Sequence, residues 1–154
     1  MKHWQETSRV LRMLAQLAGQ GRAAALATVV SIDGSAYRRP GAKMLITDDG
    51  ETAGGVSGGC LEADVREVAL SVIRSGTPQL RHYDNRTDDQ SPFGLGLGCN
   101  GAVDIFVQRA SASEILGTAK RVTQLLRGDR AFAVSSVVRG PRGVGRSIVV
   151  EARG

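Results

Sequence analysis

The chain has 154 residues, of which 42% are hydrophobic and 23% charged, and these values are typical of one globular domain. Its 20 glycines follow no three-residue period, which excludes collagen, and its apolar runs are shorter than the roughly 20 residues of a membrane-spanning helix. Lys and Arg number 20 against 15 Asp and Glu, so the net charge is +5 and the pI is about 9.9. This charge favours anionic partners such as phosphates, nucleotides or acidic protein surfaces, without choosing among them.

The N-terminal segment and the cysteines indicate the cellular compartment of the protein. The first fourteen residues, MKHWQETSRVLRML, contain neither an apolar signal core nor a small-residue cleavage site, so we expect a cytoplasmic protein with no membrane span. Cys60 and Cys99 lie 39 residues apart in glycine-rich segments, where we expect reactive or buried thiols rather than a disulfide. His3 and His82 each stand alone and give no metal-ligand spacing.

The first third of the chain predicts a helix followed by three strands. Residues 3–18 have helical spacing and end at Gly19 and Gly21. Their apolar stripe consists of Trp4, Leu11, Leu14 and Ala18, with Val10 and Leu17 beside it. The segments 23–31 and 43–47 are typical of buried strands, and the tight turn at Asp49-Gly50 leads into a short strand within 51–56.

A second helix is predicted after Ser57-Gly58-Gly59, closed by Gly76 and Pro78. Its apolar face consists of Val65, Val68, Ala69, Val72 and Ile73. Strands at 78–84 and 102–108 follow, separated by a long polar and glycine-rich loop. A third helix at about 112–127 and a final strand–turn–strand complete the chain. Together these elements predict an α/β fold, a mixed sheet with about three helices packed on it.

Two parts of the chain resemble each other. ALATVV (25–30) resembles AVSSVV (133–138), and GAKMLI (41–46) resembles GRSIVV (145–150). Each pair flanks a basic loop with Pro and Gly, and the second loop is four residues shorter. We infer a repeated unit, with the chain cut inside or just after its second copy; the alternative is that any two strand–turn–strand segments look alike.

The segment Ser57-Gly58-Gly59-Cys60-Leu61-Glu62 carries the clearest chemistry, because it opens a predicted helix. The first N–H groups of a helix have no partner within it and carry partial positive charge, while glycines let a ligand approach the backbone. This combination predicts an anion or phosphate site. The helix dipole would lower the pKa of the Cys60 thiol and favour thiolate, a nucleophile and soft metal ligand, although the nearby Glu62 would partly oppose that shift.

Two further constellations stand beside it. The glycines of Phe93–Gly101 alternate beside a cysteine, which indicates tight packing of the backbone around another group. Gly98, Cys99 and Gly101 are therefore candidate binding residues. The run Gly34–Lys43 contains Arg38 and Arg39, which could hold an anion in bidentate fashion, together with Lys43. Each of the three segments has a plainer interpretation. Cys60 could be a small core residue, the segment around Cys99 a flexible turn, and Arg38 with Arg39 a solvated charge pair. Neither phosphate-binding fingerprint of nucleotide sites is present.

In their order, these motifs resemble a known family. The succession ALATVV, GSAYRRPGAKMLIT, DG and GGVSGGCLEADV resembles the N-terminal domain of the XdhC/CoxI family, over roughly residues 4–108. The family's second motif is usually Gly-Cys-Gly-Gly, whereas this chain has Asn100 in place of one glycine. Larger members of this family have two domains, of which the C-terminal one is Rossmann-like. We therefore divide the chain into an XdhC/CoxI-like domain at 1–110 and a continuation at 111–154. The chain is either cut before such a second domain or is a short member of the family.

The resemblance implies a maturation factor for molybdenum hydroxylases such as xanthine dehydrogenase and carbon monoxide dehydrogenase. Such a factor binds the molybdenum cofactor, as molybdopterin or its dinucleotide form, protects it and delivers it to the large subunit of the apo hydroxylase. The resemblance also implies a cofactor-sulfurating enzyme as a further partner. The implied cofactor-binding residues are Ser57, Gly58, Gly59, Cys60, Arg38, Arg39, Lys43, Gly98, Cys99 and Gly101. Cys60 and Cys99 are the ones that could approach molybdenum, and the activated Cys60 is the more important by hypothesis.

Three other interpretations stay open. A thiol-dependent hydrolase or oxidoreductase would use Cys60 and needs a base, for which His82 is the serious candidate. A nucleic-acid binder would fit the pI, but the basic residues are dispersed and the aromatic residues form no stacking motif, so we expect no nucleic-acid partner. A purely structural interaction domain would bind a protein without taking up a ligand. We expect a chaperone rather than a catalyst, and a homodimer, since such dimers are the commonest oligomers.

Overall fold

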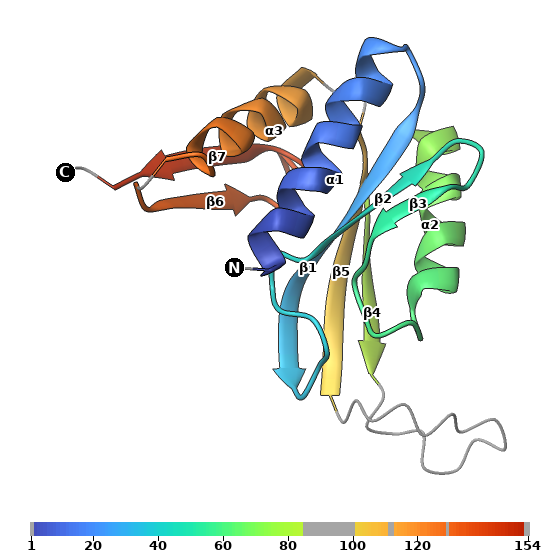
Figure 1. Ribbon diagram of the computed structural model, residues 1–154. Helices are drawn as coiled ribbons and strands as arrows, with labels where there is room; N and C mark the ends of the chain where they lie inside the picture. Colours follow the sequence, from blue (N-terminus) through green and yellow to red (C-terminus); the bar gives the residue numbers. More distant parts are fainter. Residues whose placement is uncertain (1, 85–100, 111–112, 129, 153–154) are drawn as a thin grey trace, which may run out of the picture.

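The computed structural model describes residues 2–84, 101–110, 113–128 and 130–152. Its helices are α1 (Lys2–Gly19), α2 (Glu62–Ser75) and α3 (Ser113–Leu125). Its strands are β1 (Ala24–Gly34), β2 (Lys43–Thr47), β3 (Thr52–Gly54), β4 (Gln79–Asp84), β5 (Gly101–Arg109), β6 (Phe132–Ser136) and β7 (Ser147–Glu151) (Figure 1). These elements confirm the three helices and the seven strand segments predicted above. No described helix has the length and apolar character needed to cross a membrane.

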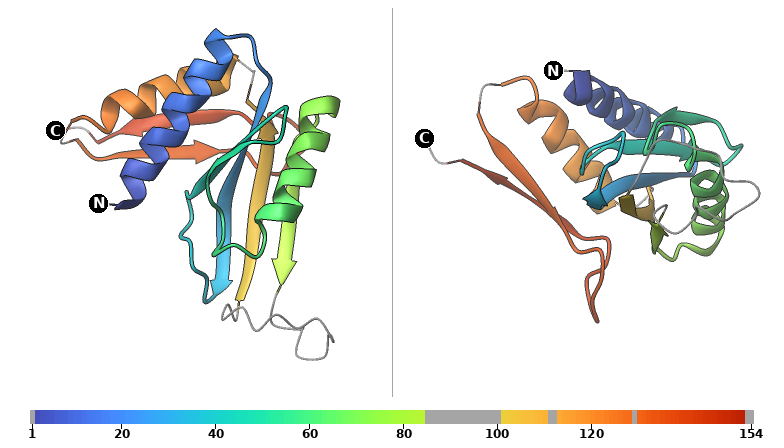
Figure 2. Two further views of the ribbon diagram at one scale, coloured as in Figure 1. Left: turned by 45° about the vertical axis from the view of Figure 1, so that its right-hand side comes forward. Right: turned by 90° about the horizontal axis from the view of Figure 1, so that it is seen from below.

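The prediction of a mixed sheet is wrong. The main sheet has five strands in the order β3-β2-β1-β5-β4, and every neighbouring pair is antiparallel. The reason lies in where α2 takes the chain. The helix leads from β3 at one edge of the sheet to β4 at the opposite edge, so the strands that flank it never become neighbours. The remaining strands, β6 and β7, form a separate antiparallel hairpin that projects from the main sheet (Figures 1 and 2).

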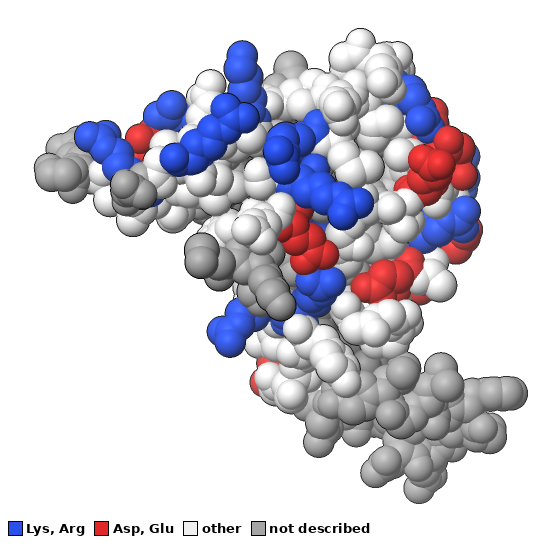
Figure 3. Space-filling view, in the orientation of Figure 1, with Lys and Arg blue, Asp and Glu red and all other residues white. Residues whose placement is uncertain are grey.

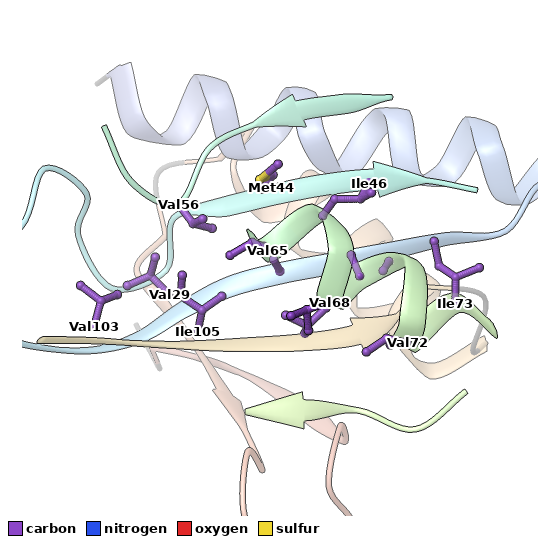
Figure 4. Close-up of a cluster of buried hydrophobic side chains, with 14 residues drawn as sticks. Val29, Met44, Ile46, Val56, Val65, Val68, Val72, Ile73, Val103 and Ile105 are labelled. Atoms are coloured by element: carbon purple, nitrogen blue, oxygen red, sulfur yellow. The ribbon is translucent and has the colours of Figure 1, made fainter. Parts of the chain in front are cut away.

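Helix α2 covers one face of the main sheet because its apolar stripe matches the inward side chains of the strands. All five residues predicted for that stripe are buried. They pack against Ala25, Ala27, Val29, Met44, Ile46, Val56, Val103, Ile105 and Val107 (Figure 4). The helix ends at Gly76, whose positive φ of 73° suits glycine and lets its N–H reach the carbonyl of Val72.

Helices α1 and α3 cover the other face. Their buried residues form a second core with the opposite side chains of the sheet: Val10, Leu11, Leu14, Ala24, Leu26, Leu45, Ala53, Ala110, Ala119 and Val122. Trp4, predicted on the buried stripe of α1, is instead 57% exposed, with its ring 6.1 Å from that of Phe132 in β6. The first turn of α1 therefore reaches past the sheet toward the hairpin.

The repeated unit inferred from the sequence is confirmed at the level of hydrogen bonds. The pairs from Ala24↔Thr47 to Thr28↔Lys43 correspond one to one with the pairs from Phe132↔Glu151 to Ser136↔Ser147. Beyond the strands, Val29 N–H donates to the carbonyl of Ala42 at 3.0 Å, and the equivalent Val137 N–H donates to Arg146 at 2.9 Å. Gly41 and Gly145 take the same turn position, with φ of 93° and 92°. Each hairpin also follows a helix, α1 or α3, so the unit is a helix and two strands.

Candidate functional site

Residues 56–61, which we name the Cys60 loop, connect β3 to α2. Glu62 and Ser57 hold this loop in place. One carboxylate oxygen of Glu62 accepts the N–H groups of Val56 at 3.1 Å and Ser57 at 2.8 Å, and the other accepts the Ser57 hydroxyl. The Ser57 hydroxyl oxygen in turn accepts the N–H groups of Gly59 and Leu61, both at 3.1 Å. The loop is therefore built around a serine and a carboxylate.

This arrangement changes the meaning of the predicted anion site. The carboxylate of Glu62 and the Ser57 oxygen already accept four of the loop's N–H groups, so the chain supplies its own anion there. Burial raises the pKa of Glu62, but hydrogen bonds from the Ser57 hydroxyl and from the N–H groups of Ser57, Glu62 and Val56 outweigh it, and the pKa lies below its ordinary value. Glu62 is thus ionised at neutral pH and acts as a structural anchor.

The structure explains why two positions of the loop are glycine. Gly59 has φ of 118°, a conformation that side-chain-bearing residues rarely adopt. A Cβ added to Gly58 would stand 2.8 Å from the ring of Tyr37, so the missing side chain is what lets this ring lie against the loop. Tyr37 itself is 66% exposed. An aromatic ring and the bare backbone of the Cys60 loop therefore share one exposed surface.

Arg38 ties the loop to α1 rather than standing free for a ligand. Its Nε donates to the carbonyl of Ser57 at 3.3 Å, and its terminal nitrogen forms a 2.5 Å ion pair with Glu6. Glu6 has no signal in the sequence that would associate it with the site, because it lies 32 residues away. Arg39 is exposed and lines a hollow of about 200 Å³ beside Pro40. Arg39 is therefore the arginine available to an incoming anion.

Basic side chains extend beyond this site. Figure 3 shows Lys and Arg spread over the face formed by α1 and α3, and Asp and Glu gathered on the side of α2. On this face the positive charge follows the two helices and forms no single cluster.

Cys60 is half-buried and lies two residues before the first residue of α2. Its neighbour Leu61 packs against the core beneath that helix. Gly98 and Cys99 lie outside the described residues. Within the described part of the chain, no group of three His, Cys, Asp or Glu side chains could hold a metal ion. Cys60 is thus a soft donor on a loop that Glu62 and Ser57 hold in shape.

Gly101 has a packing role at the start of β5. A Cβ at this residue would stand 2.7 Å from the carbonyl oxygen of Asp33 and 2.8 Å from the backbone of Ser35. The glycine lets β5 run directly against the end of β1, where it pairs with Gly34. This close packing explains why residue 101 is glycine, and no bound ligand is needed to explain it.

Lys43 belongs to the other face of the sheet. Its side chain lines a cavity beneath α1, and its amine donates to the Thr28 hydroxyl at 3.2 Å. Burial lowers the pKa of Lys43 to about 8. The Cys60 loop leads into α2, which covers the opposite face, so the structure separates Lys43 from the thiol.

The base proposed for a thiol enzyme is also on the wrong face. His82 neighbours Tyr83, which packs toward the core under α2, and successive side chains of a strand point to opposite faces. The His82 ring nitrogen Nδ1 lies 2.6 Å from Asp104, its partner on β5. His82 is therefore not placed to activate Cys60.

Comparisons with known proteins agree with these motifs. The model of the XdhC and CoxI family matches residues 17–84, from the end of α1 to the end of β4. The chain is 40% identical over 97 residues to a probable xanthine dehydrogenase subunit of Bacillus subtilis (strain 168), covering 63% of this chain and 29% of that protein. It is 35% identical over 117 residues to the molybdenum cofactor insertion chaperone PaoD of Escherichia coli (strain K12), covering 75% and 36%.

A solved structure resembles the whole described fold. The crystal structure of a xanthine dehydrogenase from Bacillus halodurans matches with a TM-score of 0.68 and 30% identity, over 93% of this chain and 42% of that one. The chain spans about a third of the length of the curated relatives it matches.

Proposed function

Residues 17–84 form a domain of the XdhC and CoxI family, and on this basis we propose that the chain binds the molybdenum cofactor as cargo and delivers it to an apo molybdenum hydroxylase. The target is an enzyme of the xanthine dehydrogenase or carbon monoxide dehydrogenase type. The observation that carries the proposal is the 35% identity to a molybdenum cofactor insertion chaperone over 75% of this chain. In this proposal the chain acts as a chaperone rather than as a catalyst.

The chemistry of the Cys60 loop supports cargo binding. Thiolate is a soft ligand suited to molybdenum, and Cys60 presents its sulfur on a loop that Glu62 and Ser57 already hold in shape. Preorganisation of this kind reduces the entropy lost on binding. The exposed Tyr37 ring beside Gly58 offers a stacking surface, and the exposed Arg39 offers a cation for a phosphate. Cys99 is the second thiol of the proposal, with Gly98 beside it.

The proposed partners follow from the cargo. The large subunit of the apo hydroxylase receives the cofactor, and an enzyme that sulfurates the cofactor acts before delivery. We propose a cytoplasmic homodimer for the carrier. The cofactor form, mononucleotide or dinucleotide, is a result that the same binding experiment provides.

The experiment is uptake of cofactor released from a purified molybdoenzyme. The protein is incubated with the cofactor under anoxic conditions and desalted, and molybdenum and pterin are measured per chain. We expect near-stoichiometric uptake by the natural chain, loss with Cys60→Ser, and transfer to an apo hydroxylase that restores its activity. Ser71→Ala, on the half-buried flank of α2, is the matched control. Uptake that is absent from the natural chain would exclude the carrier function, and full uptake by Cys60→Ser would exclude the thiol role.

A further inference from the structure

The β6–β7 hairpin has one side that no other element covers within the described part of the chain. Side chains alternate along a strand, so one set packs toward α3 and the other set points away from it. Figure 2 shows the helices on one side of the hairpin only. The residues that point away are all exposed. We name them the outer face: Ala133, Ser135, Val137, Ile148 and Val150.

The equivalent face of the first unit is part of the core. The matching hydrogen bonds equate the outer face with five residues that are at most 1% exposed and lie under the apolar stripe of α2 (Figure 4): Ala25, Ala27, Val29, Met44 and Ile46. In the outer face, Val137, Ile148 and Val150 are instead 39%, 63% and 54% exposed. Contiguous exposed apolar residues mark interaction sites. The outer face therefore has the chemistry of a helix-binding surface without a helix on it.

We propose that the outer face binds an amphipathic helix of a partner protein that carries acidic residues in its first turn. Such a helix docks through apolar side chains spaced three and four residues apart, as in other helix-binding surfaces. The outer face belongs to the second unit and the Cys60 loop to the first, so this inference does not rest on the proposed function.

The way α2 is seated on the first unit gives the orientation of the partner helix. The Cys60 loop, which leads into α2, lies beside the connection between β1 and β2. There the Tyr37 ring lies against Gly58, and Arg38 Nε donates to the carbonyl of Ser57 at 3.3 Å. A helix seated on the outer face in the same way begins beside the equivalent connection of the second unit, residues 137–146.

Charge selects the kind of partner. The connection at 137–146 carries three exposed arginines, Arg139, Arg142 and Arg146. Residues 111–154 contain eight Lys and Arg against three Asp and Glu, whereas residues 1–110 contain twelve of each, so the whole net charge of +5 lies in the second part. This charge attracts an acidic first turn and steers its approach. It opposes a second copy on this face, because two outer faces would bring like charges together.

The width of the hairpin sets the strength of binding. Helix α2 also packs against Val103, Ile105 and Val107 of β5, and the two-stranded sheet of the described hairpin has no equivalent of that strand. A partner helix on the outer face therefore buries less apolar area than α2 does. Since affinity from apolar contact grows with the area removed from water, we expect reversible binding rather than a permanent complex.

The test uses α2 itself as the pattern for a probe. A synthetic peptide with the sequence of residues 62–75 carries the apolar stripe and two acidic residues in its first turn. A cross-link between positions 71 and 75 keeps it helical, because isolated helices of this length are marginal in water. Binding to the purified natural chain is measured by calorimetry at pH 7 and low salt. We expect this peptide to bind, and absence of binding would overturn the proposal.

Two control peptides separate the features of the helix. One has Val68→Ser and Val72→Ser, which break the apolar stripe, and the other has Glu62→Lys and Asp64→Lys, which reverse the charge of the first turn. We expect each to bind at least tenfold more weakly than the natural sequence. Equal binding by either control would overturn the proposed recognition.

Variants of the chain locate the site. Ile148→Asp places a charge in the outer face at a residue that is already 63% exposed, so the fold is kept and we expect at least a tenfold loss of affinity. Gln124→Asp adds the same charge on the exposed surface of α3 and should leave the affinity unchanged. Arg139→Met combined with Arg142→Met should weaken binding severalfold and reduce its dependence on salt. Unchanged affinity in Ile148→Asp would overturn the assignment, and thermal unfolding confirms that each variant is folded.

Two further measurements distinguish other occupants of the outer face. In sedimentation of the natural chain and Ile148→Asp, a dimer that the substitution dissociates would show that a second copy covers the face, and would overturn the proposal. An oligomeric state that the substitution leaves unchanged supports a face that is free for a partner. Binding to vesicles of phosphatidylserine and phosphatidylcholine that is lost in Ile148→Asp would assign the face to a membrane surface, and would also overturn the proposal.

Discussion

The two helix–hairpin units have the same backbone hydrogen bonds but very different burial. Leu26, Met44 and Ile46 in the first unit are 4%, 1% and 0% exposed. Their counterparts in the second unit, Val134, Ile148 and Val150, are 44%, 63% and 54% exposed. The first hairpin lies inside a five-stranded sheet with α2 on its far face, whereas the second packs one face against α3 and the Trp4 ring of α1. The local sequence thus suffices for the hairpin, and its neighbours decide what becomes core.

The units also differ in the residues that carry chemistry. Between the equivalent pairs Thr28↔Lys43 and Ser136↔Ser147, the first unit has 14 residues and the second has 10. The longer segment contains Tyr37, which lies against Gly58 of the Cys60 loop, and Arg38, which bonds to that loop and to α1. Lys43 in the first unit corresponds to Ser147 in the second, where the hydroxyls of Ser136 and Ser147 lie 2.7 Å apart. One unit has therefore acquired the candidate functional residues, while β6 of the other lines the cavity beneath α1.

The largest expected difference concerns equivalent side chains on the α2-facing side. We expect Met44→Ala to cost about 2–5 kcal/mol, because a buried side chain leaves a cavity. Ile148→Ala, at the equivalent exposed position, should cost within about 0.5 kcal/mol. Urea unfolding of both variants measures the two costs. Equal costs would mean that the second hairpin is covered in solution, and the contrast between the units would then fail.

A second difference lies at Lys43, where a buried amine occupies the position of Ser147. The pKa of Lys43 falls from 10.5 to about 8, so the folded state disfavours the charged amine. We expect Lys43→Met to stabilise the protein at pH 7 by up to about 3 kcal/mol, since each pKa unit corresponds to about 1.4 kcal/mol. Below pH 8 this gain is complete. It declines between pH 8 and 10.5, where the unfolded chain still binds the proton that the folded chain has lost, and vanishes above.

Unfolding curves of Lys43→Met and the natural chain from pH 6 to 11 test the direction of this stability difference and its dependence on pH. Lys120→Met, at an exposed site, should show no such pH dependence. A Lys43→Met variant that is less stable than the natural chain at pH 7 would mean that the contacts of the amine outweigh the cost of burying it.

The comparison of units also shows what sequence reasoning can reach. The apolar stripe of α2, the strand segments and the repeat were all predictable, because they depend on spacing within a few residues. Strand order was not, since the path of α2 across the sheet depends on distant pairing. The anchoring of Arg38 by Glu6, and the isolation of Lys43 from Cys60, depend on which face of the sheet each element covers. Glu62 was noted only for its charge near Cys60, because its bonds to Val56 and Ser57 depend on how the loop folds back onto the start of α2.

Glu62 tests whether the Cys60 loop is held from within. We expect Glu62→Gln to cost about 1–2 kcal/mol at pH 7, because hydrogen bonds to a charged acceptor are worth more than those to a neutral one. The pKa of Glu62 is lowered in the folded state, so its stabilisation is complete above the ordinary pKa and is lost as the pH falls through the folded value. The stability difference between the natural chain and the variant should therefore disappear in acid. Urea unfolding at pH 7 and pH 3 measures it, and an equal difference at both would contradict the anchoring role.

The smallest expected effect concerns Arg38 and Glu6, a tie that the first unit makes between α1 and the Cys60 loop. Both side chains are about 30% exposed, and partly exposed ion pairs contribute only about 0.2–1 kcal/mol. We therefore expect a coupling energy in this range from a double-mutant cycle of Glu6→Gln and Arg38→Met measured by thermal unfolding. Added salt should reduce it, because screening weakens exposed pairs. Arg12→Met, on the exposed side of α1, should show no coupling to Glu6→Gln. A coupling of several kcal/mol would mean that this ion pair, and not Glu62, is the main anchor of the loop.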